Sequence, residues 1–272
     1  LEDDVVADEP VAPPTQRAIF AFGGIDGNVI NASNLVNSSG VMGTDVTGVG
    51  TARKQLAAAG FGGDKAIFAF GKNQAGTKLS MTNLVSNSGV VASDTTGTST
   101  ANQSMGAATY GVDKAIFAFG YTSGNTNTRN LVANNGVMAS TVSGAGSARH
   151  DLAATGYGTP ANGTAIFAYG YISGSTAVSN LVNNVGVVAS DVGAVGTARQ
   201  NLAAARYGAD KALFAFGSGP VNTRNLVNSS GVIAADVSGA GTARFYINAA
   251  MYGGDKAIFG FGTTGSNFLS MT

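Results

Sequence analysis

The chain of 272 residues has no cysteine, no tryptophan and a single histidine, His150. The absence of thiols excludes disulfides, thiolate metal sites and a cysteine nucleophile. With one imidazole there is no second histidine for a copper or zinc site, and only His150 could act as the base of a nucleophile–base pair. We therefore expect a protein that is not an enzyme and that holds neither a metal nor another cofactor.

Charge and long apolar runs are scarce as well. Charged residues make up 11% of the chain, and 15 basic residues are balanced by 15 acidic ones. Such a chain has no overall field to attract nucleic acid or an anionic membrane. No run approaches the ~18 to 20 apolar residues of a membrane-spanning helix, and the N-terminus lacks the basic and then apolar pattern of a signal peptide. The sequence predicts no nucleic-acid partner and no membrane insertion.

Glycine, with 40 residues, and one repeated aromatic segment are abundant. The clearest copy of the segment, KAIFAFG, covers residues 65–71. Its copies begin at Arg17, Lys65, Lys114, Thr164, Lys211 and Lys256. Their central Ile or Leu residues follow one another at intervals of 45 to 50 residues. The chain is therefore an array of units, each of which needs its neighbours to cover its apolar faces.

Each unit contains four short segments with strand character, joined by turn signals. In the second unit these are the aromatic segment 65–71, residues 79–85 ending in Asn-Leu-Val, residues 90–93 and the small-residue segment 104–111. A four-stranded sheet that repeats every ~40 to 50 residues is typical of a propeller blade. We therefore predict an all-β fold, a six-bladed β-propeller of four-stranded antiparallel blades.

Ala-rich pieces such as residues 56–59 are the main argument for helices instead. A glycine follows each piece within a few residues, so no helix would reach the length that cooperative formation needs. Only small side chains fit near a propeller axis, so we expect the Ala-rich strand innermost and the Gly-Val-Val-Ala-Ser strand outermost. In an extended aromatic strand, Ile67 and Ala69 lie on one face and Phe68 and Phe70 on the other. We expect the aromatic rings to be buried between blades.

Three features together resemble the Kelch repeat: Thr-Ala-Arg before the Ala-rich strand, the aromatic strand ending in glycine, and the strand near Asn-Leu-Val. The resemblance covers residues 17–272, although the double glycine of that family occurs only at Gly23-Gly24 and its tryptophan is absent. The sequence motifs DKAIFAFG, NLV, GVVASD and GTAR are also similar to those of repeat proteins among the virion structural proteins of tailed bacteriophages. These resemblances imply a non-enzymatic structural or interaction propeller of a virion surface or tail, which binds a glycan or a neighbouring virion protein.

Two other functions remain open. One is a secreted lectin-like or adhesion module of cellular origin. The other is an oxidase-like enzyme of the Kelch type, whose metal site would need His, Tyr and Cys side chains that this chain cannot assemble. The expected location is the virion or the extracellular space.

The two ends of the chain are expected to close the ring. The aromatic strand occurs six times, whereas the Asn-Leu-Val strand has five full copies and a stub at residues 267–272. Residues 1–16 form an acidic N-terminal arm in which Val5-Val6-Ala7 resembles the outermost strand. We predict that residues 5–7 supply this strand to the last blade, so that residues 17–272 form one propeller with a repeat of about 48 residues. The short connection from Asp8 to Arg17 leaves little room for an innermost strand in the first blade.

A recurring arginine gives the first group of candidate binding residues. It follows Thr-Ala or Ser-Ala in four units and is replaced by Asn102 in the third. The four are Arg53, Arg149, Arg199 and Arg244. Around one mouth of a propeller channel, their guanidinium groups could bind carboxylates, sulfates or sugar hydroxyls. Alternatively, each arginine could donate to backbone carbonyls of the neighbouring blade and serve the architecture.

The loops after the aromatic strands give the second group. They differ in length and side chains between units while their flanks stay nearly constant, and loops on a rigid scaffold commonly carry recognition. They supply aromatic, amide and guanidinium groups that could bind a sugar or a peptide: Tyr121, Tyr171, Asn125, Asn127, Arg129 and Arg224. Solvated loops without a ligand are the alternative interpretation.

His150 and the recurring aspartates have plainer interpretations. His150 occupies a position that differs between units, so we expect it to be a surface loop residue. Asp64 and its counterparts precede lysine in tight turns, which aspartate favours. The acids that end the outermost strand, such as Asp94, stand singly, without the cluster that a calcium loop needs. No metal site is therefore expected.

Overall fold

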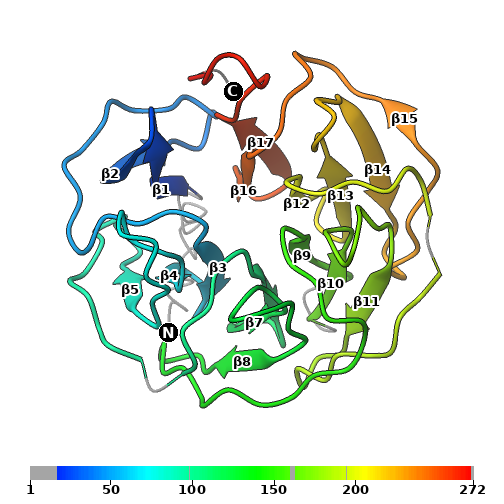
Figure 1. Ribbon diagram of the computed structural model, residues 1–272, viewed down its shortest axis with the longest axis horizontal. Helices are drawn as coiled ribbons and strands as arrows, with labels where there is room; N and C mark the ends of the chain where they lie inside the picture. Colours follow the sequence, from blue (N-terminus) through cyan, green and yellow to red (C-terminus); the bar gives the residue numbers. More distant parts are fainter. Residues whose placement is uncertain (1–16, 98, 160–162, 194, 271–272) are drawn as a thin grey trace, which may run out of the picture.

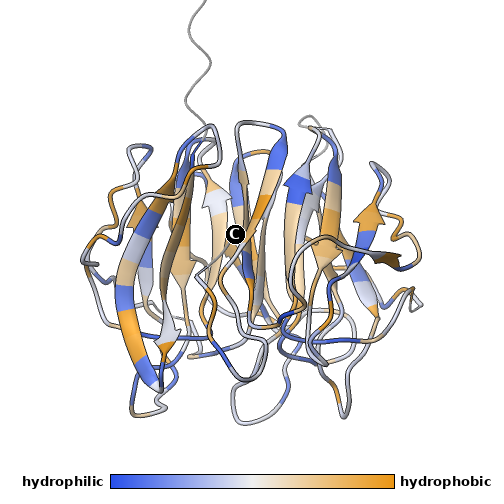
Figure 2. Ribbon diagram, turned by 90° about the horizontal axis from the view of Figure 1, so that it is seen from above, coloured by the Kyte–Doolittle hydropathy of each residue, from blue (hydrophilic) through white to orange (hydrophobic). Residues whose placement is uncertain are grey.

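The computed structural model of the protein describes residues 17–97, 99–159, 163–193 and 195–270. The strands of these residues form six small antiparallel sheets, and none of the described residues is helical. Figure 1 shows the sheets standing around the middle of the view in the order of the sequence. In the view of Figure 2, the strands run between two faces that carry the turns and loops. We name the sheets first to sixth in chain order.

The first sheet contains β1 (Ala18–Ile25) and β2 (Asn28–Val36), and the second contains β3 (Ala57–Phe61), β4 (Lys65–Ala69) and β5 (Thr82–Val85). The third contains β6 (Gly106–Tyr110), β7 (Lys114–Ala118) and β8 (Arg129–Val132), and the fourth contains β9 (Ala153–Tyr157), β10 (Thr164–Ala168) and β11 (Ser179–Val182). The fifth contains β12 (Ala203–Tyr207), β13 (Lys211–Ala215), β14 (Thr223–Val227) and β15 (Val237–Ser238), and the sixth contains β16 (Asn248–Tyr252) and β17 (Lys256–Gly260).

The Ala-rich segment is a strand and not a helix, as predicted. In the second sheet β4 lies between β3 and β5, with Phe68 opposite Ala58 on one side and opposite Asn83 on the other. The Ala-rich strands lie toward the middle of the view in Figure 1. Their small side chains allow close approach, and β3 contacts β6, β6 contacts β9, β9 contacts β12 and β12 contacts β16.

The prediction of a regular outermost strand is wrong. Residues 90–93 join the end of β5 only through the isolated bridge between Val85 and Val91, with backbone bonds from Ala92 N to the Leu84 carbonyl oxygen and from Ser86 N to the Val90 carbonyl oxygen. The Asn83 side chain donates to the carbonyl of Ala92, which removes that acceptor from a regular ladder. Among the described residues only the fifth sheet has a fourth strand, β15, and it follows the predicted segment.

The two phenylalanines of an aromatic strand lie on opposite faces of the sheet, which corrects the prediction that they share one. Phe68 packs with Phe22 of the first sheet, whereas Phe70 packs with Phe117 of the third. The alternation fails because Phe70 has a φ of 65°, in the left-handed region. The residue at this position has a φ of 63° to 66° in all six units, so the reversal belongs to the repeat.

Gly71 completes the reversal at the end of the aromatic strand. Its φ is +96°, and a Cβ atom there would lie 2.7 Å from the backbone oxygen of Lys54. A side chain would therefore meet both backbone strain and a collision with the chain that enters β3. A glycine with a positive φ, between 96° and 135°, follows the second ring in all six units.

Aromatic pairs join each sheet to the next. In each pair the second ring of one unit contacts the first ring of the following unit, with ring centroids 5.4–5.7 Å apart. The pairs are Phe22–Phe68, Phe70–Phe117, Phe119–Phe167, Tyr169–Phe214, Phe216–Phe259 and Phe261–Phe20. The last of them joins the sixth sheet to the first. The rings of the second to fifth units are buried, as predicted.

Backbone hydrogen bonds also run from unit to unit at both ends of the innermost strands. At one end, amide groups that follow these strands donate to the next turn, as Gly62 N does to Asp113 O. At the other end, the backbone N of the residue just before an innermost strand donates to the carbonyl oxygen of its counterpart in the preceding unit, as in Ser104, Asp151, Asn201 and Tyr246. Gln55 accepts the bond from Ser104, and all five residues have φ values of 52° to 57°. The face on which this second series lies also carries His150, and we call it the His150 face.

The predicted closure by residues 5–7 falls outside the described residues. The described part of the first sheet consists of β1 and β2, and that of the sixth consists of β16 and β17. In the predicted stub, Leu269 N donates to the Gly262 carbonyl oxygen at 2.8 Å, as Leu79 N does to Gly71 in the second unit. The stub therefore corresponds to the residues that precede an Asn-Leu-Val strand and not to the strand itself.

Candidate binding site

The recurring arginines are buried between sheets. Arg53 is fully buried, and its Nε donates to the Phe70 carbonyl oxygen at 2.9 Å while its Nη2 donates to Asn83 Oδ1 at 2.6 Å. The same guanidinium lies 4.1 Å from the ring centroid of Phe22 in the first sheet. It therefore bonds to one sheet and stacks on the preceding one. Arg149, Arg199 and Arg244 likewise stack on a ring of the preceding sheet.

An aspartate completes this arrangement. Asp94 lies 3.7 Å from Arg53 and accepts hydrogen bonds from Thr51 and Asn83. Burial alone would raise the pKa of Asp94, but these hydrogen bonds and the charge of Arg53 lower it overall. Burial lowers the pKa of Arg53 to about 10, so the guanidinium is charged at neutral pH. We call Arg53, Asn83 and Asp94, together with their counterparts in the fourth and fifth units, the inter-sheet network.

The third unit replaces the charged pair of this network as a whole. Asn102 stands in the place of the arginine, and its Nδ2 donates to the Phe119 carbonyl oxygen as Arg53 does to that of Phe70. Thr141 stands in the place of the aspartate and accepts from Thr100 N at 3.0 Å. Because cation and anion disappear together, neither charge is left buried without its partner.

All four predicted arginines therefore serve contacts inside the fold. Each is buried, and each donates to a backbone carbonyl of the sheet that follows it. Groups that a ligand can reach on the His150 face come from other positions.

Two of the predicted loop tyrosines come together around His150. The imidazole lies between the rings of Tyr121 and Tyr171, with a centroid distance of 5.3 Å to each. His150 and Tyr171 are also joined by two backbone hydrogen bonds. Only 19% of the His150 side chain is exposed, so this residue is more enclosed than the surface loop residue that we expected. We call Tyr121, His150 and Tyr171 the aromatic sector.

Asn125 and Asp151 contact the two ring nitrogens of His150. Asn125 Nδ2 donates to the Ile172 carbonyl oxygen at 2.7 Å, which turns Oδ1 toward the imidazole, 2.7 Å from Nδ1. An amide oxygen can only accept, so Nδ1 is the protonated nitrogen. Asp151 Oδ2 lies 3.4 Å from Nε2. The Asn125 contact and the two flanking tyrosine rings hold the imidazole in one orientation, as a preorganised binding site requires.

A group of lysines adjoins Tyr121. Lys54 is bridged to Lys72, and Lys72 is bridged to Lys78, in antiparallel pairs. Residues directly opposite each other in such pairs project from the same face, so the three side chains stand together. Lys78 Nζ lies 5.5 Å from the ring centroid of Tyr121. We call Lys54, Lys72 and Lys78 the basic sector.

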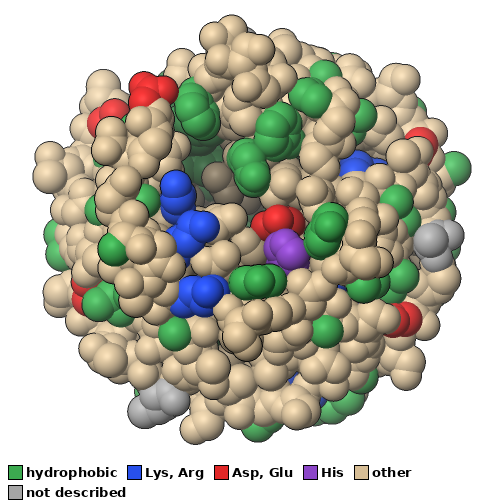
Figure 3. Space-filling model, in the orientation of Figure 1, with side chains coloured by type: hydrophobic (Ala, Val, Ile, Leu, Met, Phe, Trp, Pro, Cys, Tyr) green, Lys and Arg blue, Asp and Glu red, His purple; other side chains and the backbone are tan. Residues whose placement is uncertain are grey.

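The His150 face has a hollow at its centre. Figure 3 shows Lys and Arg side chains gathered on one side of this hollow, with histidine, acidic and hydrophobic side chains on the opposite side. The contacts given above agree with this distribution, because they join the basic sector to Tyr121 and Tyr121 to His150. The face therefore combines a cationic surface, aromatic rings and oriented polar groups at a concave place.

The other three predicted loop residues have different surroundings. Asn127 donates to two glycine carbonyls of its own unit, and asparagines of the first and fifth units make the same bonds. Arg129 is the first residue of β8 and donates to the Ser143 carbonyl oxygen. Arg224 is exposed in β14. The structure thus brings Tyr121, Tyr171 and Asn125 together, whereas the bonds of Asn127 and Arg129 lie within their own unit.

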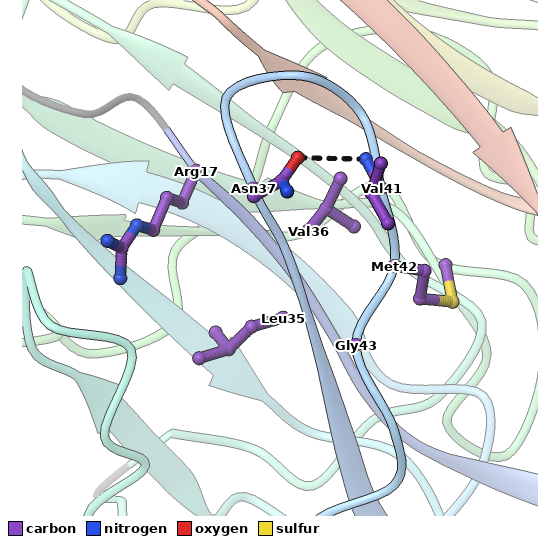
Figure 4. A pocket seen from close by; sticks show the side chains of 7 residues that line it. All are labelled: Arg17, Leu35, Val36, Asn37, Val41, Met42 and Gly43. Atoms are coloured by element: carbon purple, nitrogen blue, oxygen red, sulfur yellow. Dashed lines mark hydrogen bonds between the residues drawn. The ribbon is translucent and has the colours of Figure 1, made fainter.

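A shallow hollow beside β2 occurs in more than one unit and so marks no single site. Figure 4 shows it in the first unit, where Asn37 Oδ1 accepts from Val41 N at 2.9 Å. Its lining is Arg17, Leu35, Val36, Asn37, Val41, Met42 and Gly43. The equivalent residues of the second unit, such as Lys65 and Leu84, line a similar hollow. This feature belongs to the repeated architecture.

Variation between units could have identified His150 and the basic sector from the sequence. The position after the recurring arginine is Lys54, Gln103, His150, Gln200 or Phe245, so it varies as much as the loops do. In the structure this position pairs with the residue after the strand-ending glycine, which is a second variable position. The same variation led us to expect a plain surface residue at His150, because nothing in the sequence shows that two variable positions are paired.

Three further observations concern metal binding, membrane-spanning helices and similarity to known proteins. No group of three or more His, Cys, Asp or Glu side chains within the described residues is placed to hold a metal ion. The described ranges also contain no helix that is long and apolar enough to cross a membrane. No protein-family model matches the chain, and no curated protein matches its sequence.

Proposed function

We propose that the six sheets are the blades of a closed β-propeller of the Kelch type, and that the protein is a non-enzymatic recognition module. Contacts between consecutive sheets support a ring, and so do the contacts of β16 with β1 and of Phe261 with Phe20. The small-residue strands toward the middle of Figure 1 support a propeller. Such a scaffold presents its loops on two faces, where ligands of rigid folds commonly bind.

The ligand that we propose is a glycan bound at the aromatic sector. The observation that carries this proposal is the position of Tyr121 and Tyr171 on either side of His150, with Asn125 held beside them by hydrogen bonds. Tyrosine offers a large apolar surface with a polar tip, and ligand sites combine such surfaces with a few oriented polar groups. A sugar ring has an apolar face and hydroxyl groups, so it fits both requirements.

A screen of immobilised oligosaccharides followed by calorimetric titration tests this proposal. We expect the protein to bind at least one saccharide, and Tyr121→Ala and Tyr171→Ala each to weaken the affinity about tenfold, because each removes an aromatic contact. Phe268→Ala is the matched control, because Phe268 is an aromatic side chain of the sixth unit that is 56% exposed. Its replacement should leave the affinity unchanged. Failure to bind any saccharide, or an equal loss for Phe268→Ala, would contradict the proposal.

We also propose that the protein is a component of a virion surface or tail. The similarity of its repeated sequence motifs to those of repeat proteins in bacteriophage virions supports this location. A glycan-binding module there could contact a host surface. Mass spectrometry of purified particles that encode the chain tests it. We expect the chain to remain with the particles through a density gradient, and its complete loss from them would contradict the location without affecting the glycan proposal.

A further inference from the structure

The basic sector is an arrangement that the fold alone does not favour. Lys54, Lys72 and Lys78 project from one face of a bridged ladder, and like charges directly opposite each other are destabilising. None of the three forms an ion pair with a carboxylate of the described residues, whereas Lys65 and Lys256 each pair with the aspartate before them. The three positive charges therefore have no counter-charge in the described part of the chain.

The repeated architecture does not require these lysines. The other four lysines of the chain are the first residues of aromatic strands: Lys65, Lys114, Lys211 and Lys256. At the three bridged positions of the basic sector, the third unit has Gln103, Tyr121 and Asn125, and the fourth has His150, Tyr171 and Ser175. The backbone bridges form without lysine in both units. The basic sector is thus specific to the second unit.

Resting on the glycan proposal, we propose that the ligand is an anionic saccharide whose carboxylate or sulfate binds the basic sector while a sugar ring packs on Tyr121. Ammonium groups form strong, charge-assisted hydrogen bonds with such anions. The 5.5 Å between Lys78 Nζ and the Tyr121 centroid places the charge and the aromatic surface within the span of one sugar residue.

The opposite side of the hollow gives this ligand an orientation. Asp151 lies beside His150, and its carboxylate disfavours a second anionic group at that place. The acidic group of the saccharide is therefore directed toward the basic sector, and neutral hydroxyl groups are directed toward Asn125 and Asp151. A saccharide with one acidic group at its end fits this arrangement better than one with closely spaced charges.

Matched oligosaccharides test the inference. The probes are a dextran oligosaccharide with one carboxylate at its end, one with a single sulfate at its end and a neutral dextran, all of equal length. We expect at least one anionic probe to bind about tenfold more tightly than the neutral probe, and its affinity to fall as salt rises from about 0.05 to 0.5 M, because salt screens charges. The triple variant Lys54→Gln, Lys72→Gln, Lys78→Gln should lose this advantage of about tenfold. Its binding of neutral probe should stay the same.

Two controls separate a built site from general attraction to positive charge. The triple variant Lys65→Gln, Lys211→Gln, Lys256→Gln removes the same charge from the starts of the aromatic strands, and it should bind the anionic probe like the wild type. A single-stranded oligonucleotide of similar charge should bind at least tenfold more weakly than the saccharide. An equal loss in this control variant, or equal binding of the oligonucleotide, would overturn the inference.

The remaining outcomes distinguish this inference from the glycan proposal on which it rests. Neutral and anionic probes that bind equally, with no effect of the Lys54, Lys72 and Lys78 substitutions, would overturn the inference and leave the glycan proposal standing. Binding of no saccharide would overturn both. Because the lysines repel one another, the basic-sector variant should melt at the wild-type temperature or above, and a clear decrease would overturn their assignment to ligand binding.

Discussion

Between the sheets the six units repeat nearly the same contacts, whereas on the His150 face no two units combine the same side chains among the described residues. The aromatic rings of successive units pair at similar distances through the whole chain, and the arginine Nε bonds to the same carbonyl in three units. By contrast, the bridged positions of the His150 face hold lysine, glutamine, asparagine, tyrosine, histidine, serine, threonine or phenylalanine. The backbone geometry at these positions is shared, so the difference lies in what the side chains contact.

This comparison shows which positions of the fold tolerate a single substitution. A side chain between sheets has its partners within the protein, so a single substitution leaves those partners without their contacts. The third unit shows the consequence, because Asn102 and Thr141 replace the arginine and the aspartate together. A side chain on the His150 face can be replaced singly without leaving a buried group unpaired. We infer that the interior maintains the contacts between the sheets, whereas side chains on the His150 face can change without loss of those contacts.

The largest expected effect comes from removing an interior ring. Phe117→Ala deletes a fully buried side chain that contacts Phe70 of the preceding sheet. We expect the free energy of unfolding to fall by about 3 to 5 kcal/mol, because the cavity lies between two sheets and cannot close easily. Urea denaturation measures the change. A loss below about 1 kcal/mol would contradict the role of these rings in joining the sheets.

Substitutions in the inter-sheet network test the same comparison in more detail. Arg53→Asn copies the third unit at one position and leaves Asp94 without its cation, so we expect a loss of about 3 kcal/mol. Adding Asp94→Thr copies the third unit at both positions and should recover part of this loss. A double-mutant cycle measures the coupling. Exposed Arg224→Asn is the control and should change stability by about 0.5 kcal/mol or less.

Strict additivity in this cycle would contradict the account. Additive losses would mean that Arg53 and Asp94 act independently, and the joint replacement in the third unit would then have no energetic basis. A full recovery in the double variant is not expected, because asparagine cannot reproduce the stacking of the Arg53 guanidinium on Phe22.

Acid should lower the free energy of unfolding by protonating the aspartates of the inter-sheet network. The folded-state pKa values of Asp94, Asp191 and Asp236 lie below the ordinary value despite burial, because of hydrogen bonds and the nearby arginines. A carboxyl whose folded pKa is lowered stabilises the fold above the unfolded pKa of about 3.9, and this contribution is lost as the pH falls through the folded value. We expect the free energy of unfolding to decrease below about pH 4. The Arg53→Asn, Asp94→Thr variant should decrease less, and an identical slope would contradict this assignment.

The sequence was sufficient for features that depend on the repeat itself. The unit length, the order of the three inner segments and the burial of the aromatic rings all follow from a pattern that neighbouring copies must satisfy together. The sequence was not sufficient where a contact made by one segment changes the backbone conformation or the backbone hydrogen bonds of another. The left-handed Phe70 precedes a glycine that lies against the Lys54 backbone, and the Asn83 side chain takes a carbonyl of the expected outermost strand. Neither contact can be read from residue type.

The site was predicted in part for the same reason. Tyr121, Tyr171 and Asn125 lie on loops whose variation marked them, whereas Asn127 makes a bond that recurs in other units and belongs to the architecture. His150 gains its surroundings from two units, through Tyr121 of one and Tyr171 of the other. Such a meeting depends on how the sheets stand next to each other, which local sequence patterns do not specify.

One pair of variants tests the division between interior and face most directly. Tyr169 and Tyr171 are two residues apart, yet Tyr169 is fully buried between sheets against Phe214, whereas Tyr171 lies on the His150 face. We predict that Tyr169→Ala lowers the free energy of unfolding by about 3 to 5 kcal/mol and keeps the glycan affinity in the folded protein. Tyr171→Ala should lower stability by about 1 kcal/mol or less and weaken the affinity about tenfold. Equal losses of stability, or an affinity that falls with Tyr169→Ala and not with Tyr171→Ala, would contradict this division.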